Sequence, residues 1–322
     1  MIDAFLQGTG WEAAQQQALA ADASYRTYRR LQQGDETALL MVAPPAHEPK
    51  TPIFVTLSNW LCQAGLSAPR IIKSDLAQGL VLLEDFGVQS FSQVLEDAPE
   101  REAALYSLAG DVVCYLAGRA LPDLPPYDEA TMRTELSVFC DDWWPDAFGT
   151  EMPSDVRAAF DRAWDAPLAL AEKARQTAPI VTLRDFHKDN LFFLPNRTGP
   201  AQVGLIDFQD ALIGHAAYDV VSLLQDVRRD ISDAVQNEVL NAVSKALGDP
   251  HFETVYAIYG AQRALKILGV FVRLDRRDGK PAYRVHLGRC WNRFLRNMDQ
   301  PALASVKTWL DTHIPVQKRQ TA

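Results

Sequence analysis

The chain has 322 residues, of which 48% are hydrophobic and 23% are charged, so it is long enough for two modest domains with a sizeable core. Its formal net charge of -9 argues against a nucleic-acid partner, because binding phosphates normally requires a basic face. The four cysteines are far apart and show no CxxC spacing, which argues against zinc or redox chemistry and favours a reducing compartment.

Targeting signals are the next feature to consider. The first residues, Met-Ile-Asp-Ala-Phe, lack the basic and apolar regions of a secretory signal. Uninterrupted apolar runs also fall short of the roughly 18 residues that a membrane span needs. We therefore expect a cytoplasmic protein without a membrane partner, and the sequence indicates no obligate protein partner.

The first 87 residues or so are predicted to combine a small antiparallel sheet with one or two helices. Residues 10–21 are rich in Ala and Gln, which favours a helix. Alternation of apolar and polar residues, together with turn signals such as Gly34-Asp35, predicts short strands. The expected strands are 25–31, 37–42, 71–72 and 80–83, and a helix is expected at 53–64.

The remainder of the chain is predicted to be mostly helical. Apolar residues recur with helical periodicity at 101–119, 154–176, 219–228, 253–274 and 301–310. The exception is a hairpin formed by 191–194 and 203–206. The expected fold class is α+β with two lobes, and a cleft between lobes is a common ligand site.

Two polar segments around this hairpin carry the chemistry. Asp185 and Asn190 lie five residues apart on a loop that enters the first strand, and Asp207 follows the second strand. The hairpin would bring the three side chains together. Magnesium takes oxygen ligands such as those of Asn190 and Asp207, and the free carboxylate of Asp185 could accept a proton from an attacking hydroxyl. R-D-x-x-x-x-N followed by D-F-x is typical of a phosphoryl-transfer centre that uses ATP and Mg2+.

Longer stretches make the resemblance specific. They are DASYRTYRRL at 22–31, GLVLLEDFG at 79–87, LRDFHKDNL at 183–191, IDFQDALIGHAAYDVVSLLQD at 206–226 and AQRALKILGVFVRL at 261–274. In this order they resemble the aminoglycoside-phosphotransferase and choline-kinase superfamily, which has the protein-kinase-like fold. Within it, the chain is most similar to the bacterial cell-wall-recycling kinases that phosphorylate N-acetylmuramate and N-acetylglucosamine at the anomeric hydroxyl.

The resemblance implies a division of the chain and a set of roles. Residues 1–87 would form the nucleotide-binding lobe, with its hinge at 84–87, and residues 88–322 would form the helical lobe with the catalytic loop and sugar site. Asp185 matches the catalytic base, and Asn190 and Asp207 match the metal ligands. Structural support for the catalytic loop would come from Arg184 and Asp219.

The nucleotide would contact two parts of the N-terminal lobe. Residues 22–26 match the loop that covers the phosphates, and the backbone of 84–87 would hold the adenine edge. The nucleotide-binding residues implied are Ser24, Tyr25, Arg26, Glu84 and Phe86.

The third expected strand departs from the kinase pattern. Residues 37–42 contain no lysine, although kinases place there the lysine that contacts the α- and β-phosphates. Arg26 is our candidate for the missing cation, with Arg29 behind it, because both follow the phosphate loop.

Candidate substrate contacts are less specific. Asp210 could hydrogen-bond sugar hydroxyls. Arg263 could bind a substrate carboxylate such as a lactyl group, or form a structural ion pair. Trp144, next to Trp143, could form the floor of a sugar site, or pack in a core.

Three functions are therefore compatible with the sequence. We expect an ATP-dependent kinase for a small amino sugar, acting at the anomeric hydroxyl. An aminoglycoside O-phosphotransferase is the alternative enzyme, although the tail, with Lys318 and Arg319, lacks the carboxylates that cationic substrates would require. A non-catalytic kinase-like scaffold is the third interpretation, and it is motivated by the missing lysine.

Overall fold

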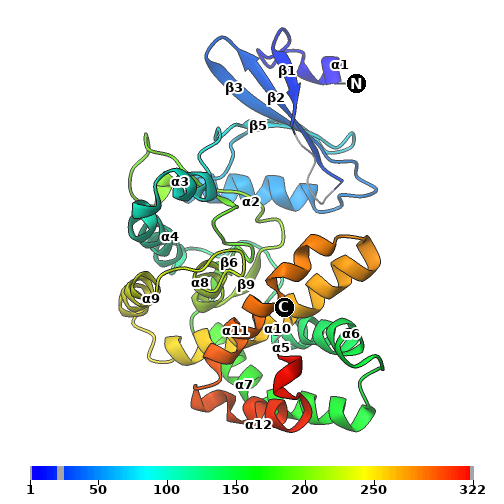
Figure 1. The fold of residues 1–322 in the computed structure, drawn as a ribbon. Coiled ribbons are helices and arrows are strands. Elements are labelled where there is room, and N and C mark those ends of the chain that lie inside the picture. The colour runs from blue at the N-terminus through cyan, green and yellow to red at the C-terminus, as the bar shows by residue number, and fades with distance from the viewer. Residues whose placement is uncertain (1, 20–24, 320–322) are drawn as a thin grey trace. The chain divides into compact units, whose positions relative to one another are not determined.

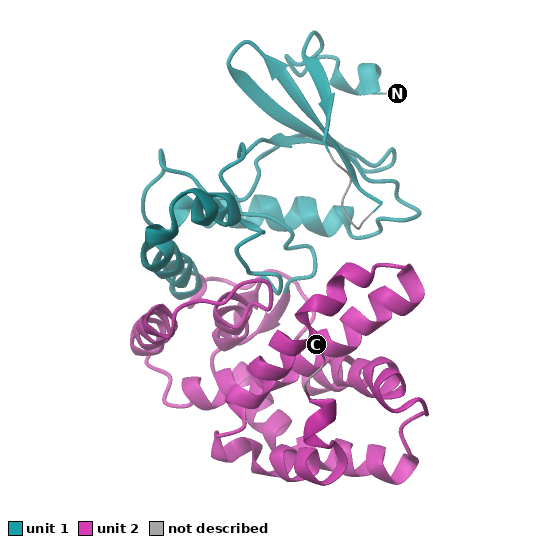
Figure 2. Ribbon diagram, viewed as in Figure 1, with its two compact units in different colours: residues 1–115, 183–211 teal, residues 116–182, 212–322 magenta. Residues whose placement is uncertain are grey.

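The structure is a computed structural model that describes residues 2–19 and 25–319. The chain forms two compact units, each assembled from two separate segments of sequence (Figure 2). Unit 1 contains residues 1–115 and 183–211, and unit 2 contains residues 116–182 and 212–322. This division differs from the expected lobes, 1–87 and 88–322, because residues 88–115 and residues 183–211, which include the predicted catalytic loop, group with the unit that contains the sheet.

Unit 1 is built on an antiparallel sheet, which has five strands in the order β1-β2-β3-β5-β4 within the described residues (Figure 1). The strands are β1 (Gln15–Ala18), β2 (Thr27–Gln33), β3 (Glu36–Val42), β4 (Ile71–Asp75) and β5 (Leu80–Glu84). Strands β2 and β3 form a hairpin through Gly34, whose φ of 61° is left-handed and costs a glycine little. The four predicted strands are confirmed.

The helix predicted at 10–21 is wrong. Residues Gln15–Ala18 form the edge strand β1, which pairs with β2 from Gln15 opposite Gln32 to Ala18 opposite Arg29. All four β1 side chains are exposed, so the segment has no apolar face with which to pack a helix. Helix propensity is a weak preference, and here the free edge of β2 offers the backbone hydrogen bonds instead.

The two faces of the sheet have different partners. A short helix, α1 (Ile2–Leu6), closes the apolar outer face with Phe5 and Leu6. The sheet residues in this cluster are Leu31, Ala38, Leu40, Leu80 and Leu82. Side chains point alternately to the two faces of a strand, so Tyr28 and Leu39 point to the other face, where they lie near helix α2 (Thr51–Gln63). Helix α2 confirms the helix that was predicted at 53–64.

The predicted hairpin is formed by β7 (Leu191–Phe193) and β8 (Val203–Leu205). Its backbone is fixed to the N-terminal segment at both strands. Leu205 N donates to Ser67 O at 2.7 Å, and Phe193 N donates to Gln89 O at 2.8 Å. Unit 1 also contains α3 (Phe91–Asp97) and most of α4 (Glu102–Leu116).

Unit 2 is mostly helical and is organised around α10 (Phe252–Asp278). By length and composition α10 could cross a membrane, but 78% of its apolar window is buried inside the structure, as expected for a core helix. The other helices are α5 (Glu129–Val138), α6 (Trp144–Phe148), α7 (Ser154–Thr177), α8 (Ala216–Leu224), α9 (Asp233–Leu247), α11 (Leu287–Asn297) and α12 (Ala304–His313). Strands β6 (Ile180–Thr182) and β9 (Leu212–Gly214) pair antiparallel.

The predicted helical segments correspond to α4, α7, α8, α10 and α12, while α3, α5, α6, α9 and α11 were not predicted. Helix α9 buries Val235, Val239 and Val243. This regular i, i+4 stripe is present in the sequence, so α9 could have been predicted from its apolar spacing.

Gly204 fixes the approach of the hairpin to the hinge segment. A Cβ atom built on Gly204 would lie 2.8 and 2.9 Å from two ring carbons of Phe86. Gly204→Ala should therefore force the ring aside and lower the free energy of unfolding by about 1–3 kcal/mol, measured by denaturant titration. Gln202→Ala, on the same hairpin but partly exposed, should change it by less than about 0.5 kcal/mol. Equal effects would contradict this account of the packing.

Candidate active site

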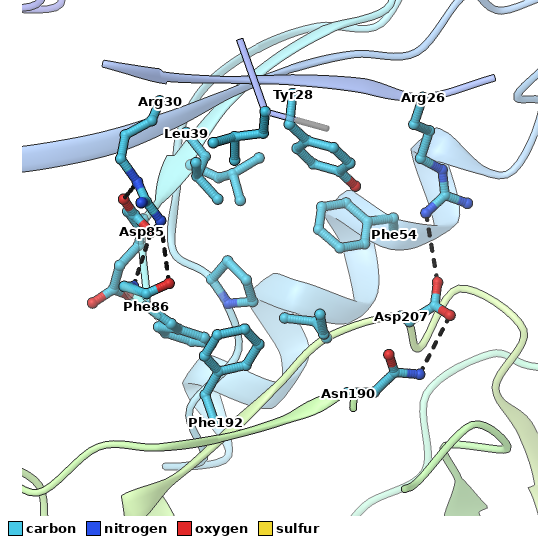
Figure 3. A pocket seen from close by; sticks show the side chains of 16 residues that line it. Arg26, Tyr28, Arg30, Leu39, Phe54, Asp85, Phe86, Asn190, Phe192 and Asp207 are labelled. Carbon is cyan, nitrogen blue, oxygen red and sulfur yellow. Dashed lines mark hydrogen bonds and ion pairs between the residues drawn. The ribbon is translucent and has the colours of Figure 1, made fainter. Parts of the chain in front are cut away.

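A cavity of about 270 Å³ lies within unit 1, between the inner face of the sheet, α2 and the β7–β8 hairpin (Figure 3). Its polar lining includes Asn190 and Asp207, and its apolar lining includes Leu39, Leu83 and Phe54. A mostly apolar cavity with a few convergent polar groups is the usual form of a small-molecule site.

The loop before β7 has a tightly constrained backbone. Asp185 N donates to Leu183 O at 2.9 Å, and Asn190 N donates to His187 O at 2.8 Å. Arg184 has a φ of 73° and Asp207 one of 61°. Left-handed backbone is uncommon for residues other than glycine, and it concentrates at functional sites.

The structure brings the predicted catalytic base, Asp185, close to the predicted metal ligands, Asn190 and Asp207. Ile206 N donates to Asn190 O at 3.2 Å, which continues the β7–β8 ladder and sets Asp207 beside Asn190. The Nδ2 atom of Asn190 donates to Asp185 O at 3.0 Å and to Asp207 Oδ2 at 3.4 Å. Figure 3 shows the amide oxygen of Asn190 on the side of the pocket.

The electrostatics of Asp207 are suited to a cation. Burial raises the pKa of Asp207, and the carboxylates of Asp185 and Asp210 raise it further, against the opposing effects of Gln209 and Arg26. A divalent cation would relieve this crowding of negative charge. The amide oxygen of Asn190 and the carboxylate of Asp207 are hard donors of the type that Mg2+ prefers, so these residues fit that ion.

Arg26 is held at the edge of this cluster. Its Nε donates to Glu48 Oε2 at 2.9 Å, and its Nη1 donates to Gln209 Oε1 at 3.1 Å. The same Nη1 lies 3.8 Å from Asp207 Oδ1. Only 11% of the Arg26 side chain and 10% of the Glu48 side chain are exposed, so the guanidinium has a fixed position.

Strand geometry explains why Arg26 takes this place. Arg26, Tyr28 and Arg30 are two residues apart and share one face of the chain, and all three line the cavity. Directly opposite Tyr28 on β3 is Met41, which is buried and uncharged, so β3 offers no cation at this position. Arg29, our second candidate, is exposed and donates to Gln16, so it points away from the cavity.

The hinge segment is held by ion pairs. Arg30 pairs with Asp85, whose side chain is only 2% exposed, at 2.5 Å. Glu84 pairs with Arg197 of the hairpin loop at 2.5 Å. The guanidinium of Arg197 also lies over the ring of Phe86. The side chains of the hinge are thus occupied, while residues 84–87 line the cavity.

The predicted phosphate loop lies partly outside the described residues. Ser24 is among the residues that the structure does not describe. The ring of Tyr25 is exposed and stacks on His47 with centroids 4.6 Å apart. Tyr25 N donates to Glu48 Oε1 at 3.1 Å, so one carboxylate anchors both this backbone and Arg26.

The candidate substrate contacts lie in different surroundings. Asp210, in unit 1, forms an ion pair with Lys50. Arg263, in α10 of unit 2, is buried and donates to Ser222 Oγ at 2.8 Å. Trp144 is 5% exposed and stacks on Phe148. Of the two roles compatible with the sequence, it therefore has the one in core packing and does not form the floor of a sugar site.

The supporting residues are both buried. Arg184 belongs to the predicted catalytic loop in unit 1, and Asp219 lies in the first turn of α8 in unit 2. Helix α8 begins at His215, whose Nδ1 accepts a hydrogen bond from Ala217 N at 3.2 Å. The role of Asp219 as a support for the catalytic loop stays a prediction.

Sequence reasoning missed several residues at this site. Glu48 follows a Pro-rich turn and belongs to no recognisable motif, and Lys50 likewise has no signal before α2. Gln209 carried a signal, because it occupies the variable third position of the D-F-x motif. For Asp85 the sequence predicts only a backbone role in the hinge, whereas its carboxylate also anchors Arg30.

Solved structures share this fold. Aminoglycoside phosphotransferase APH(2'')-Ib, in an ADP-bound crystal structure, matches with a TM-score of 0.60 and 12% identity over 90% of this chain and 92% of its own. Choline kinase LicA from Streptococcus pneumoniae matches with a TM-score of 0.57 and 12% identity over 90% and 94%. At this identity the similarity establishes a kinase-like fold.

A kinase-like fold with Asp185, Asn190 and Asp207 beside a cavity defines the class as a phosphotransferase. The chain belongs to the APH phosphotransferase enzyme family, whose model matches residues 15–258. It is 32% identical to an N-acetylmuramate/N-acetylglucosamine kinase of Caulobacter vibrioides, over 98% of this chain and 97% of the relative. It is 34% identical to a kinase of the same name from Pseudomonas aeruginosa, over 82% and 78%.

The raised pKa of Asp207 has a consequence for stability. Its folded pKa lies above the unfolded value, so the favourable contribution present at low pH is lost as pH rises through the folded pKa. Asp207→Asn should therefore raise the Tm of the ligand-free protein at pH 7, on the order of 1–3 °C, with the gain vanishing below about pH 4. Differential scanning calorimetry checks this. The exposed Asp123→Asn should show no gain, and a lower Tm for Asp207→Asn at pH 7 would contradict the account.

Proposed function

We propose that this protein is an ATP-dependent kinase of the cytoplasm that phosphorylates the anomeric hydroxyl of an amino sugar, N-acetylmuramate or N-acetylglucosamine. The observation that carries the proposal is that Asn190 and Asp207 lie side by side in the lining of a cavity in unit 1, with Asp185 bound to Asn190 through its backbone carbonyl. The substrate class is supported by the names of relatives that cover most of the chain.

Asp185 is the proposed catalytic base. Its backbone carbonyl is fixed by Asn190, and its side chain is partly exposed, as a group that meets substrate must be. The carboxylate would orient the sugar hydroxyl and accept its proton as the oxygen attacks the γ-phosphate. An anomeric hydroxyl is more acidic than an ordinary alcohol, so most of the catalysis would come from positioning and charge neutralisation.

Asn190 and Asp207 are the residues that would hold Mg2+. Bound there, the ion would neutralise charge on the phosphates of ATP. The backbone ladder at Ile206 and the left-handed turn at Asp207 keep the two donors side by side. Their spacing therefore does not depend on flexible side chains alone.

Arg26 is proposed to replace the phosphate-binding lysine of kinases. A guanidinium can donate two parallel hydrogen bonds to a phosphate. Glu48 plays the part of the glutamate that orients the lysine in kinases, here from the turn before α2 rather than from within the helix. The apolar lining around Leu39, Leu83 and Phe54 would receive the adenine ring.

The proposal is tested by measuring ADP release with N-acetylmuramate, N-acetylglucosamine, kanamycin and choline in turn. Turnover with either N-acetyl sugar, and a phosphate at C1 by phosphorus NMR of the product, is the expected result. Turnover with kanamycin alone would make the protein an aminoglycoside phosphotransferase. Nucleotide binding without turnover of any compound would sink the proposed substrate class.

Asp185→Asn should separate chemistry from binding. Loss of the base should lower kcat by about 10²–10⁴-fold, while the Kd of Mg-ATP, measured by calorimetry, should stay within about threefold of the wild-type value because Asp185 is not placed on the nucleotide. A large loss of nucleotide affinity would instead assign Asp185 a structural role.

Arg26→Ala should raise the KM for ATP by about 10–100-fold, because hydrogen bonds to charged groups contribute about 1.5–3 kcal/mol. The matched control is Arg29→Ala, three residues along, whose side chain lies on the exposed face of β2. The control should leave the KM unchanged in the same coupled assay. Equal KM values for the two variants would show that Arg26 does not bind phosphate.

A further inference from the structure

Four side chains of unit 1 form an unbroken series of contacts from the turn before α2 to the proposed metal site. Glu48 binds Arg26 at 2.9 Å, Arg26 donates to Gln209 at 3.1 Å, and Gln209 Nε2 donates to Asp207 Oδ1 at 2.8 Å. Gln209 is 7% exposed, so water competes little with these bonds.

The amide of Gln209 has only one orientation that satisfies its neighbours. Arg26 has donors and no acceptor, whereas the ionised carboxylate of Asp207 only accepts. The carbonyl oxygen of Gln209 must therefore face Arg26, and its NH2 group must face Asp207. Glutamate could accept from Arg26 but not donate to Asp207, and methionine could do neither.

The distance between the two charges shows what the amide prevents. Arg26 Nη1 lies 3.8 Å from Asp207 Oδ1, beyond hydrogen-bonding distance. Arginine and carboxylate groups that are free to approach form short, often bidentate pairs. Such a pair would occupy both the guanidinium proposed for the phosphates and the carboxylate proposed for Mg2+.

We propose that Gln209 is a positioning residue that holds Arg26 and Asp207 near each other without letting them pair. Gln209 donates a hydrogen bond to Oδ1 of Asp207, whereas Oδ2 accepts one from Asn190 Nδ2 at 3.4 Å. Glu48 holds Arg26 from the opposite side. The proposal rests on the proposed function for the roles of Arg26 and Asp207, and it adds how both stay available for ligands.

The test is a double-mutant cycle of Arg26→Ala and Gln209→Met, measured by calorimetry as the Kd of ADP with Mg2+ and as the Mg2+ concentration that half-saturates ADP binding. No sugar is needed. Gln209→Met should weaken Mg-ADP binding about tenfold and raise the half-saturating Mg2+ concentration. Adding Arg26→Ala should return the Mg2+ requirement toward the wild-type value, because the competing guanidinium is gone.

Controls separate this role from a structural one. Gln93→Met is matched, because Gln93 also donates to a carboxylate, that of Asp97 at 3.2 Å, on the exposed side of α3; it should change neither quantity. Gln209→Glu keeps the shape and one of the two bonds, and it should also raise the Mg2+ requirement. The Tm of both Gln209 variants is recorded. If Gln209→Met proves to be unfolded, Gln209→Glu still tests the proposal.

Wild-type Mg2+ dependence in both Gln209 variants would overturn the proposal, as would additive effects of Gln209→Met and Arg26→Ala. Failure of every sugar in the ADP-release panel, with these binding results intact, would overturn only the proposed substrate. Absence of Mg-ADP binding by the wild-type protein would overturn both.

Discussion

The backbone hydrogen bond from Ile206 N to Asn190 O is the contact on which the site depends. It extends the short β7–β8 ladder by one step, so that Asn190 and Asp207, seventeen positions apart in the sequence, become neighbours. Asp185 joins them because the side chain of Asn190 donates to its carbonyl. Hydrogen bonds of Ser67 and Gln89 with the same hairpin fix this group against the sheet that roofs the cavity.

The cavity combines opposing charges without neutralising them. The carboxylates of Asp185 and Asp210 lie close enough to Asp207 to contribute to its raised pKa, while Arg26 is held nearby by Glu48. Arginine and carboxylate groups that are free to approach form short, often bidentate pairs. Here the amide of Gln209 lies between Arg26 and Asp207, an arrangement that would suit the binding of phosphate and metal side by side.

The sequence was sufficient for much of the fold and for the centre of the site, for identifiable reasons. The strands of the sheet and the long helix α10 have strong periodic patterns, and the spacing of Asp185, Asn190 and Asp207 is constrained by the hairpin. Edge strand β1 could not be predicted, because its Ala- and Gln-rich residues favour a helix and only pairing with β2 makes them extended.

The side chains that contact Arg26 could not be predicted from the sequence, for a different reason. Glu48 and Gln209 are 22 and 183 positions away from Arg26, and neither belongs to a motif whose spacing specifies the contact. Trp144 was recognised in the sequence, but its role could not be assigned, because an aromatic residue has the same sequence signature in a core and in a sugar site. Burial among Phe148 and Trp309 decides between them only once the fold is known.

The split composition of unit 1 has a consequence for how the chain folds during synthesis. The backbone hydrogen bonds of Ser67 with Leu205 and of Gln89 with Phe193 join residues that are far apart in the sequence. The ribosome must therefore add more than a hundred residues after Ser67 or Gln89 before either bond can form. Contacts of such high sequence separation carry a large entropic cost and slow folding. Until then, the parts of the N-terminal segment that the hairpin covers are exposed in the nascent chain, where chaperones would have a reason to bind them.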